Sequence, residues 1–140
     1  MFMPRLIPEL DVTNLQTSLQ FYVNVVGFTV LYDRPEERFC MLDLEGARLM
    51  LEEATGSGRR FRTAPLERPL GRGVNFQIQV ADVDSLYTRV VDAGFEIVIP
   101  FEERWYRRDD QELGNRQFVV SDPDGYLMRF FADLGSRAKG

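Results

Sequence analysis

The sequence predicts a single-domain α+β fold in which the order strand, helix, strand, strand, strand occurs twice. VTNLQTSLQFYVNVVGF (residues 12–28) matches VADVDSLYTRVVDAGF (residues 80–95) with one gap, and GARLMLEE (residues 46–53) matches GYLMRFFA (residues 125–132). The length of 140 residues suits one domain with a substantial core. We therefore expect a first module, a connector, a second module and a tail, at residues 1–54, 55–72, 73–133 and 134–140.

In the first module, residues 5–12 alternate apolar and polar side chains as a strand does. Pro8 cannot donate to a ladder, which suggests an edge strand or a crossing point between subunits. Thr13 and Gln16 have the spacing of a capping box, and Gly27 is a suitable helix stop. Between them lies an apolar stripe at helical period: Leu15, Leu19, Tyr22, Val23 and Val26. Three strands are then expected, at residues 28–33, 38–44 and 47–53.

The connector has glycines, prolines and five arginines without any period, so we expect it to be mobile. Its charges are interpreted as solvated, and a lid over a ligand is the alternative. The second module then repeats the order of the first. Its expected elements begin with a strand at residues 73–80, a helix from the N-cap Asp82 to Gly94, and a strand at residues 95–99. A charged segment with aromatic residues follows at 100–113. The module ends with strands at 115–121 and 126–131, joined by the turn Asp122-Pro123-Asp124-Gly125.

Composition excludes several classes of protein. The formal net charge of −5 leaves no basic stripe for nucleic acid. No apolar run approaches the roughly 20 residues of a membrane span, and the start MFMPRLIPEL does not look like a signal peptide. A single cysteine, Cys40, fits a reducing cytoplasm. The absence of histidine excludes Ser-His-Asp and Cys-His nucleophile systems and removes the commonest ligand of catalytic zinc and iron. No cofactor is predicted.

Two motifs carry a family resemblance that spans nearly the whole chain. SLQFY (residues 18–22), followed by Gly27-Phe28, and FVVSDPDGY (residues 118–126) resemble the vicinal oxygen chelate superfamily, which includes glyoxalase I, extradiol dioxygenases and bleomycin-resistance proteins. The resemblance implies two βαβββ modules that form an incomplete barrel around a cavity, the glyoxalase/bleomycin resistance fold. It also implies a homodimer.

The metal chemistry of that superfamily does not fit these residues. In metal-dependent members, four strand positions supply His, Glu or Gln to one divalent ion, and by register they fall on Ile7, Met50, Asn75 and Arg129. Isoleucine has no donor atom, methionine is a soft ligand, and arginine is a fixed cation that repels a metal. A slip of one residue would bring in Glu9 or Glu52, which remain a poor site without histidine. The resemblance therefore points to the bleomycin-resistance branch, which sequesters a drug without changing it.

Strand alternation predicts which residues line the cavity. The side chains on one side of the strands, which we call the apolar parity, should pack beneath the helices: Leu6, Leu10, Val12, Leu49, Leu51, Phe76, Ile78, Val80, Met128 and Phe130. The side chains on the other side, which we call the mixed parity, combine apolar and polar residues: Ile7, Glu9, Asp11, Arg48, Met50, Glu52, Asn75, Gln77, Gln79, Leu127, Arg129 and Phe131. Such a mixture is typical of a concave ligand surface, with a face half covered by loops as the alternative.

An aromatic pair is expected beside this surface. Trp105 and Tyr106, next to Glu102 and Glu103, could stack on a flat ring and attract cationic groups, or they could simply cover the end of the barrel. Arg116 could cap them. The predicted ligand site is Glu9, Met50, Glu52, Asn75, Gln77, Trp105, Tyr106, Arg116 and Arg129, with no catalytic or metal-binding residue.

These residues predict a metal-free protein that sequesters a flat, cationic or zwitterionic small molecule in a dimeric cavity. Two alternatives stay open. One is a metal-independent enzyme that uses a cavity carboxylate. The other is a metal-dependent lyase or dioxygenase.

Overall fold

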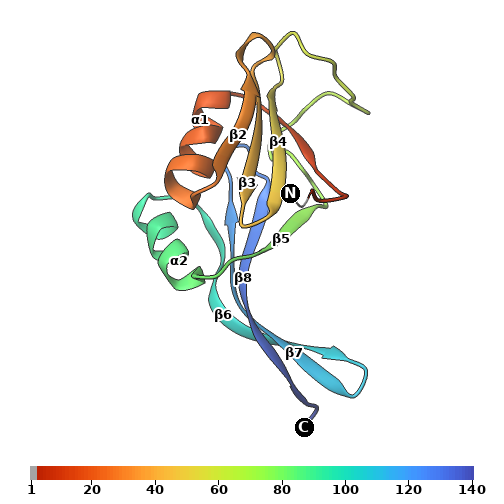
Figure 1. Cartoon of the computed structure of the whole chain (residues 1–140), viewed down its shortest axis with the longest axis vertical. Coiled ribbons are helices and arrows are strands. Elements are labelled where there is room, and N and C mark those ends of the chain that lie inside the picture. Colours follow the sequence, from red (N-terminus) through yellow and green to blue (C-terminus); the bar gives the residue numbers. More distant parts are fainter. Residues whose placement is uncertain (1–2) are drawn as a thin grey trace.

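The computed structural model describes residues 3–140. Met1 and Phe2, the first two residues of the segment MFMPRLIPEL, lie outside the described residues. It contains two four-stranded mixed sheets (Figure 1). The first sheet has the order β1-β4-β3-β2 and consists of β1 (Glu9–Val12), β2 (Thr29–Arg34), β3 (Phe39–Leu44) and β4 (Ala47–Glu53). The second has the order β5-β8-β7-β6 and consists of β5 (Asn75–Gln79), β6 (Ile97–Arg108), β7 (Gln111–Ser121) and β8 (Leu127–Ala138).

Both sheets share one topology, as the sequence repeat predicts. β1 pairs with β4 in parallel and β5 with β8 in parallel, while the remaining neighbours are antiparallel. In each module, one long helical segment connects the first strand to the second. These segments are α1 (Leu15–Leu19) with its π-helical continuation η1 (Gln20–Val26), and α2 (Val83–Asp92); a short 3-10 turn, η2 (Pro35–Glu37), joins β2 to β3. The predicted α+β class is confirmed, and the two sheets are open.

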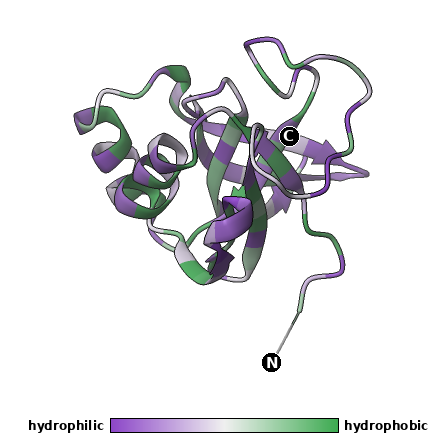
Figure 2. Cartoon of the chain, turned by 90° about the horizontal axis from the view of Figure 1, so that it is seen from above, coloured by the Kyte–Doolittle hydropathy of each residue, from purple (hydrophilic) through white to green (hydrophobic). Residues whose placement is uncertain are grey.

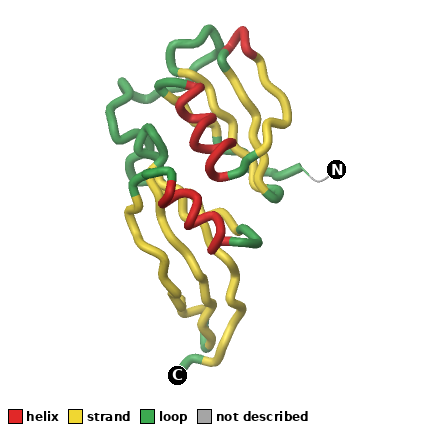
Figure 3. Tube along the Cα trace, turned by 90° about the vertical axis from the view of Figure 1, so that its left-hand side faces the viewer, coloured by secondary structure: helices red, strands yellow, loops and turns green. Residues whose placement is uncertain are grey.

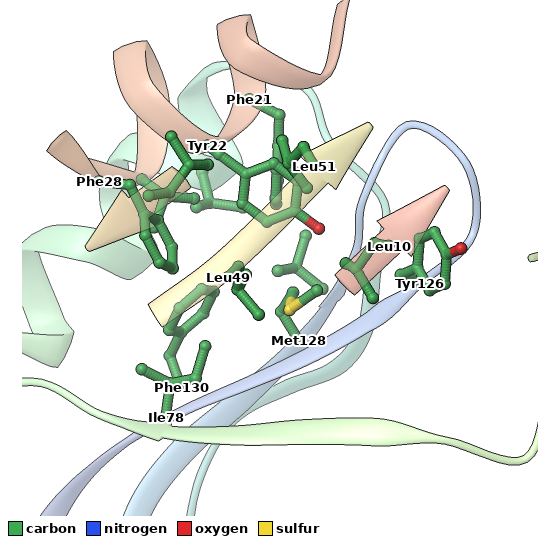
Figure 4. Packing of buried hydrophobic residues seen from close by; sticks show 14 of the residues in the cluster. Leu10, Phe21, Tyr22, Phe28, Leu49, Leu51, Ile78, Tyr126, Met128 and Phe130 are labelled. Carbon is green, nitrogen blue, oxygen red and sulfur yellow. The ribbon is translucent and has the colours of Figure 1, made fainter. Parts of the chain in front are cut away.

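The helices lie together on one side of the two sheets (Figure 3). Their contact joins the two repeats: the Arg89 guanidinium in α2 donates to the carbonyl oxygens of Val25 and Val26 at 3.0 Å each. The rings of Phe21 and Phe95 meet edge to face at 4.8 Å between centroids. Side chains from η1 and from both sheets therefore form a single core under both helices (Figure 4).

The predicted apolar parity is confirmed for most of its members. The buried ones are Leu10, Val12, Leu49, Leu51, Ile78, Val80, Met128 and Phe130. Phe76 is only partly buried against the core. The prediction was wrong for Leu6, which is 80% exposed, because β1 begins only at Glu9. Pro8 contributes a carbonyl oxygen to the amide of Met50 but has no amide of its own to extend the strand.

The start of the first helix also differs from the prediction. The N-cap is Asn14, whose Oδ1 accepts from the Thr17 amide at 3.0 Å. Thr13 instead donates its amide and hydroxyl to the carboxylate of Asp124, at 3.1 and 2.5 Å. At the second helix the predicted N-cap is correct, since Asp82 accepts from the Ser85 amide at 3.1 Å.

The turn at residues 122–125 connects distant parts of the chain. Asp122 accepts from the amides of Asp124 and Tyr126 through Oδ1, at 2.9 and 2.8 Å, and from the hydroxyl of Tyr22 through Oδ2, at 2.7 Å. The carbonyl of Asp124 accepts from the amide of Leu70 in the connector at 2.9 Å. The turn therefore fixes η1 and the connector to the second sheet.

The largest departure from the prediction is an arm that projects from the body of the molecule (Figure 1). We define the arm as residues 102–113 and 133–138. The charged segment was not predicted as a strand, yet β6 runs to Arg108, and β8 continues to Ala138 through most of the predicted tail. Charged residues come in runs there, at residues 102–104 and 107–110, so the two-residue apolar/polar period of a half-buried strand is missing.

Candidate functional site

The face of each sheet that points away from the helices carries the mixed parity. Hydrophilic and hydrophobic residues alternate along the strands (Figure 2). We call this side the outer face. Paired residues on neighbouring strands share a face, so the register assigns the outer face without ambiguity. On the second sheet, Gln77 pairs with Arg129 and Gln117 pairs with Phe131 and Glu102.

The outer face of the second sheet contains a small recess. Its volume is about 190 Å³, and its lining combines three predicted site residues with two from β7: Gln77, Tyr106, Arg129, Leu113 and Asn115. These residues come from all four strands of the sheet. The structure therefore brings together three of the nine residues of the predicted ligand site, Gln77, Tyr106 and Arg129.

An ordered amide network supports the recess from behind. The buried Gln117 donates through Nε2 to Glu102 Oε2 at 2.9 Å and to Tyr106 Oη at 2.7 Å. Its Oε1 accepts from Asn115 Nδ2 at 3.3 Å. Asn115 and Gln117 were missed by the sequence analysis. Extending strand alternation through residues 115–121 would have found them, because Gln117 pairs with Phe131 of the mixed parity.

Arg129 has an unusual environment on this face. Its Nη2 donates to the amide oxygen of Gln77, while its Nε is buried without a hydrogen-bond partner. Within residues 3–140 it forms no ion pair. A partly buried guanidinium that meets only a neutral amide is short of acceptors.

The outer face of the first sheet carries the acidic members of the predicted site. Glu9 pairs with Met50, and Asp11 pairs with Glu52, which is only 6% exposed. Burial, the Glu52 carboxylate and the Asp11 carboxylate raise the pKa of Glu9 above its usual range. The carboxylates of Glu9, Asp11 and Glu52 are therefore grouped on a face that is partly shielded from water.

Two connector arginines cover that acidic face. Arg60 donates to Glu52 Oε1 and to the carbonyl of Glu53, and its Nε lies 3.8 Å from Asp11 Oδ1. Arg62 donates to Asp11 Oδ2 at 3.1 Å and to the carbonyl of Ala54 at 2.8 Å. The prediction that the connector charges are simply solvated is wrong for these two side chains. Beside them, Asp11 and connector residues line a pocket of about 480 Å³.

Six predicted site residues lie outside the recess: Glu9, Met50 and Glu52 belong to the first sheet, and the other three belong to the second. Trp105 lies on the other face of the arm, where the Arg137 guanidinium sits 3.9 Å from its ring centroid. Arg116 pairs with Asp84 of α2 at 2.9 Å, on the helix side of the sheet. Asn75 is exposed at the start of β5. Trp105 and Tyr106 are neighbours in a strand, so their side chains point to opposite faces.

The residues at the superfamily's metal positions do not suit a metal. Arg129 is a permanent cation, and Met50 offers only a soft thioether sulfur, which is a poor ligand for a hard ion. Across residues 3–140, no group of three or more His, Cys, Asp or Glu side chains is placed to hold an ion.

Comparison with known proteins decides the family. The model of the Glyoxalase/Bleomycin resistance protein/Dioxygenase superfamily matches residues 8–130. The chain belongs to this superfamily. It is 30% identical over 139 residues to the bleomycin resistance proteins of Geobacillus stearothermophilus and Staphylococcus aureus strain MRSA252, covering 93% of this chain and 97% of each relative. These similarities make it a bleomycin-resistance-type member of the superfamily.

Solved structures agree with that assignment. The crystal structure of TioX from Micromonospora sp. ML1 matches at a TM-score of 0.67 and 26% identity, over 94% of this chain and 99% of TioX. A glyoxalase/bleomycin resistance protein from Streptomyces sp. CB03234 matches at 0.63 and 25% identity, over 89% and 96% of the two chains. Within residues 3–140, no helix is both long enough and apolar enough to cross a membrane.

Proposed function

We propose that this protein binds and sequesters a flat, cationic or zwitterionic small molecule, without a metal and without changing it. The observation that carries the proposal is the recess of the second sheet, where Gln77, Tyr106 and Arg129 meet over the amide network of Gln117. A half-buried surface with a few fixed polar groups is typical of ligand sites. The names of its bleomycin-resistance relatives support the same class of function.

A second copy of the chain completes the site in this proposal. The recess of about 190 Å³ is smaller than the roughly 300–1,000 Å³ of ligand pockets, so one chain encloses only part of a ligand. Both sheets also end in strands that expose apolar side chains: Val30, Leu31 and Tyr32 on β2, and Val98 and Ile99 on β6. A two-fold partner would cover such edges.

The acidic face gives the proposal its preference for cationic groups. Asp11 and Glu52 already pair with the guanidinium groups of Arg60 and Arg62, and Glu9 adds a third carboxylate to the same face, which supports a preference for cationic groups. Met50, the register partner of Glu9, adds an apolar side chain to this face. Trp105, Arg116 and Asn75 do not line the recess of their own chain, so we assign them no direct ligand contact within one copy.

Calorimetry with bleomycin as the probe, followed by mass spectrometry of the recovered compound, tests the proposal. We expect saturable binding and an unchanged mass. Gln77→Ala should weaken binding because Gln77 lines the recess and orients Arg129. Gln79→Ala is the matched control, since Gln79 lies exposed on the same strand and the same face. Recovery of a modified compound would contradict sequestration.

A metal-independent enzyme is the second candidate function. It is favoured by the raised pKa of Glu9, because a carboxylate with a pKa closer to neutrality is a better general base. Turnover of a bound compound that Glu9→Gln abolishes, while binding persists, would select this function. Binding without turnover in the wild-type protein would exclude it for that compound.

We also propose a cytoplasmic location. The chain's single cysteine, Cys40, is buried as a free thiol, as is usual in a reducing compartment. Fractionation of cells that express a tagged chain tests this, and recovery of the protein from the medium would contradict it.

A further inference from the structure

We infer that the recess around Arg129 is a subsite for an anionic group of the ligand, of which a carboxylate is the simplest case. This inference rests on the proposed function and names the end of the ligand that the second sheet receives. A zwitterionic ligand would then place its cationic end elsewhere in the completed cavity.

The first argument is the charge of Arg129. Charged side chains that are partly buried are normally paired, because desolvation of an isolated ion is costly. Arg60 and Arg62 follow this rule through Glu52 and Asp11. Arg129 does not: it meets only the neutral amide oxygen of Gln77, and in residues 3–140 no carboxylate oxygen comes within 4.0 Å of it.

The second argument is a count of donors and acceptors. The Tyr106 hydroxyl oxygen accepts from Gln117, so its own proton is free to point into the recess. Asn115 uses one amide hydrogen on Gln117 Oε1 and keeps the other. Gln117 itself has no donor left, since both hydrogens of Nε2 are engaged. The recess therefore offers donors from Arg129, Tyr106 and Asn115.

The acids on the same face do not satisfy these donors. Glu102 accepts from the amide of Gln117, and Asp133 accepts from the amide of Gly135 at 2.8 Å. Neither belongs to the lining of the recess. A planar carboxylate matches the guanidinium fork in geometry and supplies two acceptor oxygens, so it fits a lining that is rich in donors.

Titration with three isosteric probes tests this inference: benzoate, neutral benzamide and cationic benzamidinium. We expect benzoate to shift the NMR signals of the Arg129 Nε–H and the Asn115 side-chain amide saturably. Benzamide and benzamidinium should bind at least tenfold more weakly. Arg129→Gln should weaken benzoate binding by about 10- to 100-fold, the usual range for loss of a hydrogen bond to a charged group.

Arg104→Gln is the matched control. Arg104 is exposed, pairs with Asn115 on the same outer face and does not line the recess. We expect less than about a twofold effect on benzoate binding, because the charge of an exposed arginine outside the recess is largely screened by solvent and salt. Arg129→Lys keeps the cation but loses the fork, so it should give an intermediate affinity even where Arg129→Gln folds poorly.

Equal binding of benzamide and benzoate, or equal effects of Arg104→Gln and Arg129→Gln, would overturn the inference. The outcome also separates it from the proposed function. Bleomycin binding without benzoate binding would leave sequestration standing and remove the anion subsite. Benzoate binding at Arg129 without bleomycin binding would support the subsite and contradict sequestration of that drug.

Discussion

At the scale of single residues, the pair Tyr22 and Asp122 links the first helix to the second sheet. Tyr22 is fully buried, and its hydroxyl donates to Asp122 Oδ2 at 2.7 Å. Burial and the Asp122 carboxylate raise the pKa of Tyr22 well above its usual range. Burial likewise raises the pKa of Asp122, against the hydrogen bonds from Tyr22, Tyr126 and Asp124 that favour its charged form.

The raised pKa of Tyr22 predicts the stability of the protein in alkali. The folded state holds the Tyr22 proton more tightly than the unfolded state does. The resulting stability is fully present below the unfolded pKa of about 10 and is lost as pH rises above it. Denaturant unfolding between about pH 9 and 12 should therefore show a falling free energy of unfolding.

Tyr22→Phe tests this link. It should lower the free energy of unfolding at pH 7 by about 1–3 kcal/mol, because Asp122 loses a buried hydrogen bond. The loss of stability in alkali should become shallower. Tyr32→Phe, at a tyrosine that is 49% exposed, should change neither quantity. An unaltered alkaline slope in Tyr22→Phe would show that another group dominates it.

At the scale of elements, the turn before β8 and the connector are packed against each other. Gly125 has φ +101°, and a Cβ there would lie 2.5 Å from the Cβ of Pro69. Gly46, in the turn before β4, has φ +96° with open space around it. The two glycines share a left-handed backbone and differ in what surrounds them.

Alanine at these two positions separates backbone strain from packing. Gly46→Ala should cost about 1–2 kcal/mol of unfolding free energy, the cost of a side chain at positive φ. Gly125→Ala should cost at least about 1 kcal/mol more, because Pro69 must move as well. Chemical denaturation measures both. Equal losses of unfolding free energy in the two variants would mean that Pro69 moves aside at no measurable energetic cost.

The connector arginines predict how firmly residues 55–62 are held. Arg60→Ala leaves the buried carboxylate of Glu52 without its cation, so we expect faster amide hydrogen exchange in this segment and a loss of about 1–3 kcal/mol. Arg59→Ala is the control, because Arg59 is exposed and its guanidinium lies over the ring of Phe61. Similar exchange in both variants would contradict a role for the Arg60 contacts.

At the scale of the whole molecule, the open sheets predict self-association. The arm and the strand edges of one chain leave apolar side chains exposed, and closed two-fold pairing is the commonest way to cover them. Light scattering at micromolar concentration should give twice the chain mass of 16.2 kDa. A mass that stays at that of one chain would contradict the dimeric cavity.

Elemental analysis tests the metal-free proposal for the whole molecule. Protein purified without chelator should contain far less than one equivalent of Zn, Fe, Mn or Ni, because Arg129 places a fixed cation at a superfamily metal position. Stoichiometric metal that survives dialysis would overturn this expectation. Loss of that metal in Glu9→Gln or Glu52→Gln would then locate it on the first sheet.

The sequence by itself determined the duplicated strand and helix order, the apolar parity beneath the helices, and the turn at residues 122–125. These features follow from local chemistry: the two-residue period of a strand, the helical period, and the turn preferences of Asp, Pro and Gly. Alternation also placed Gln77 and Arg129 on one surface, where the structure finds them.

Only the tertiary structure decided how these pieces meet. It placed Arg60 and Arg62 on the acidic face, which required closing the connector back over the first sheet. It extended β6 into the arm, and this pairing turned Trp105 away from Tyr106 and the recess. It also assembled the amides of Asn115 and Gln117 behind Arg129. Such contacts join residues far apart in sequence, and their geometry depends on strand register and loop closure, which no local pattern of side chains encodes.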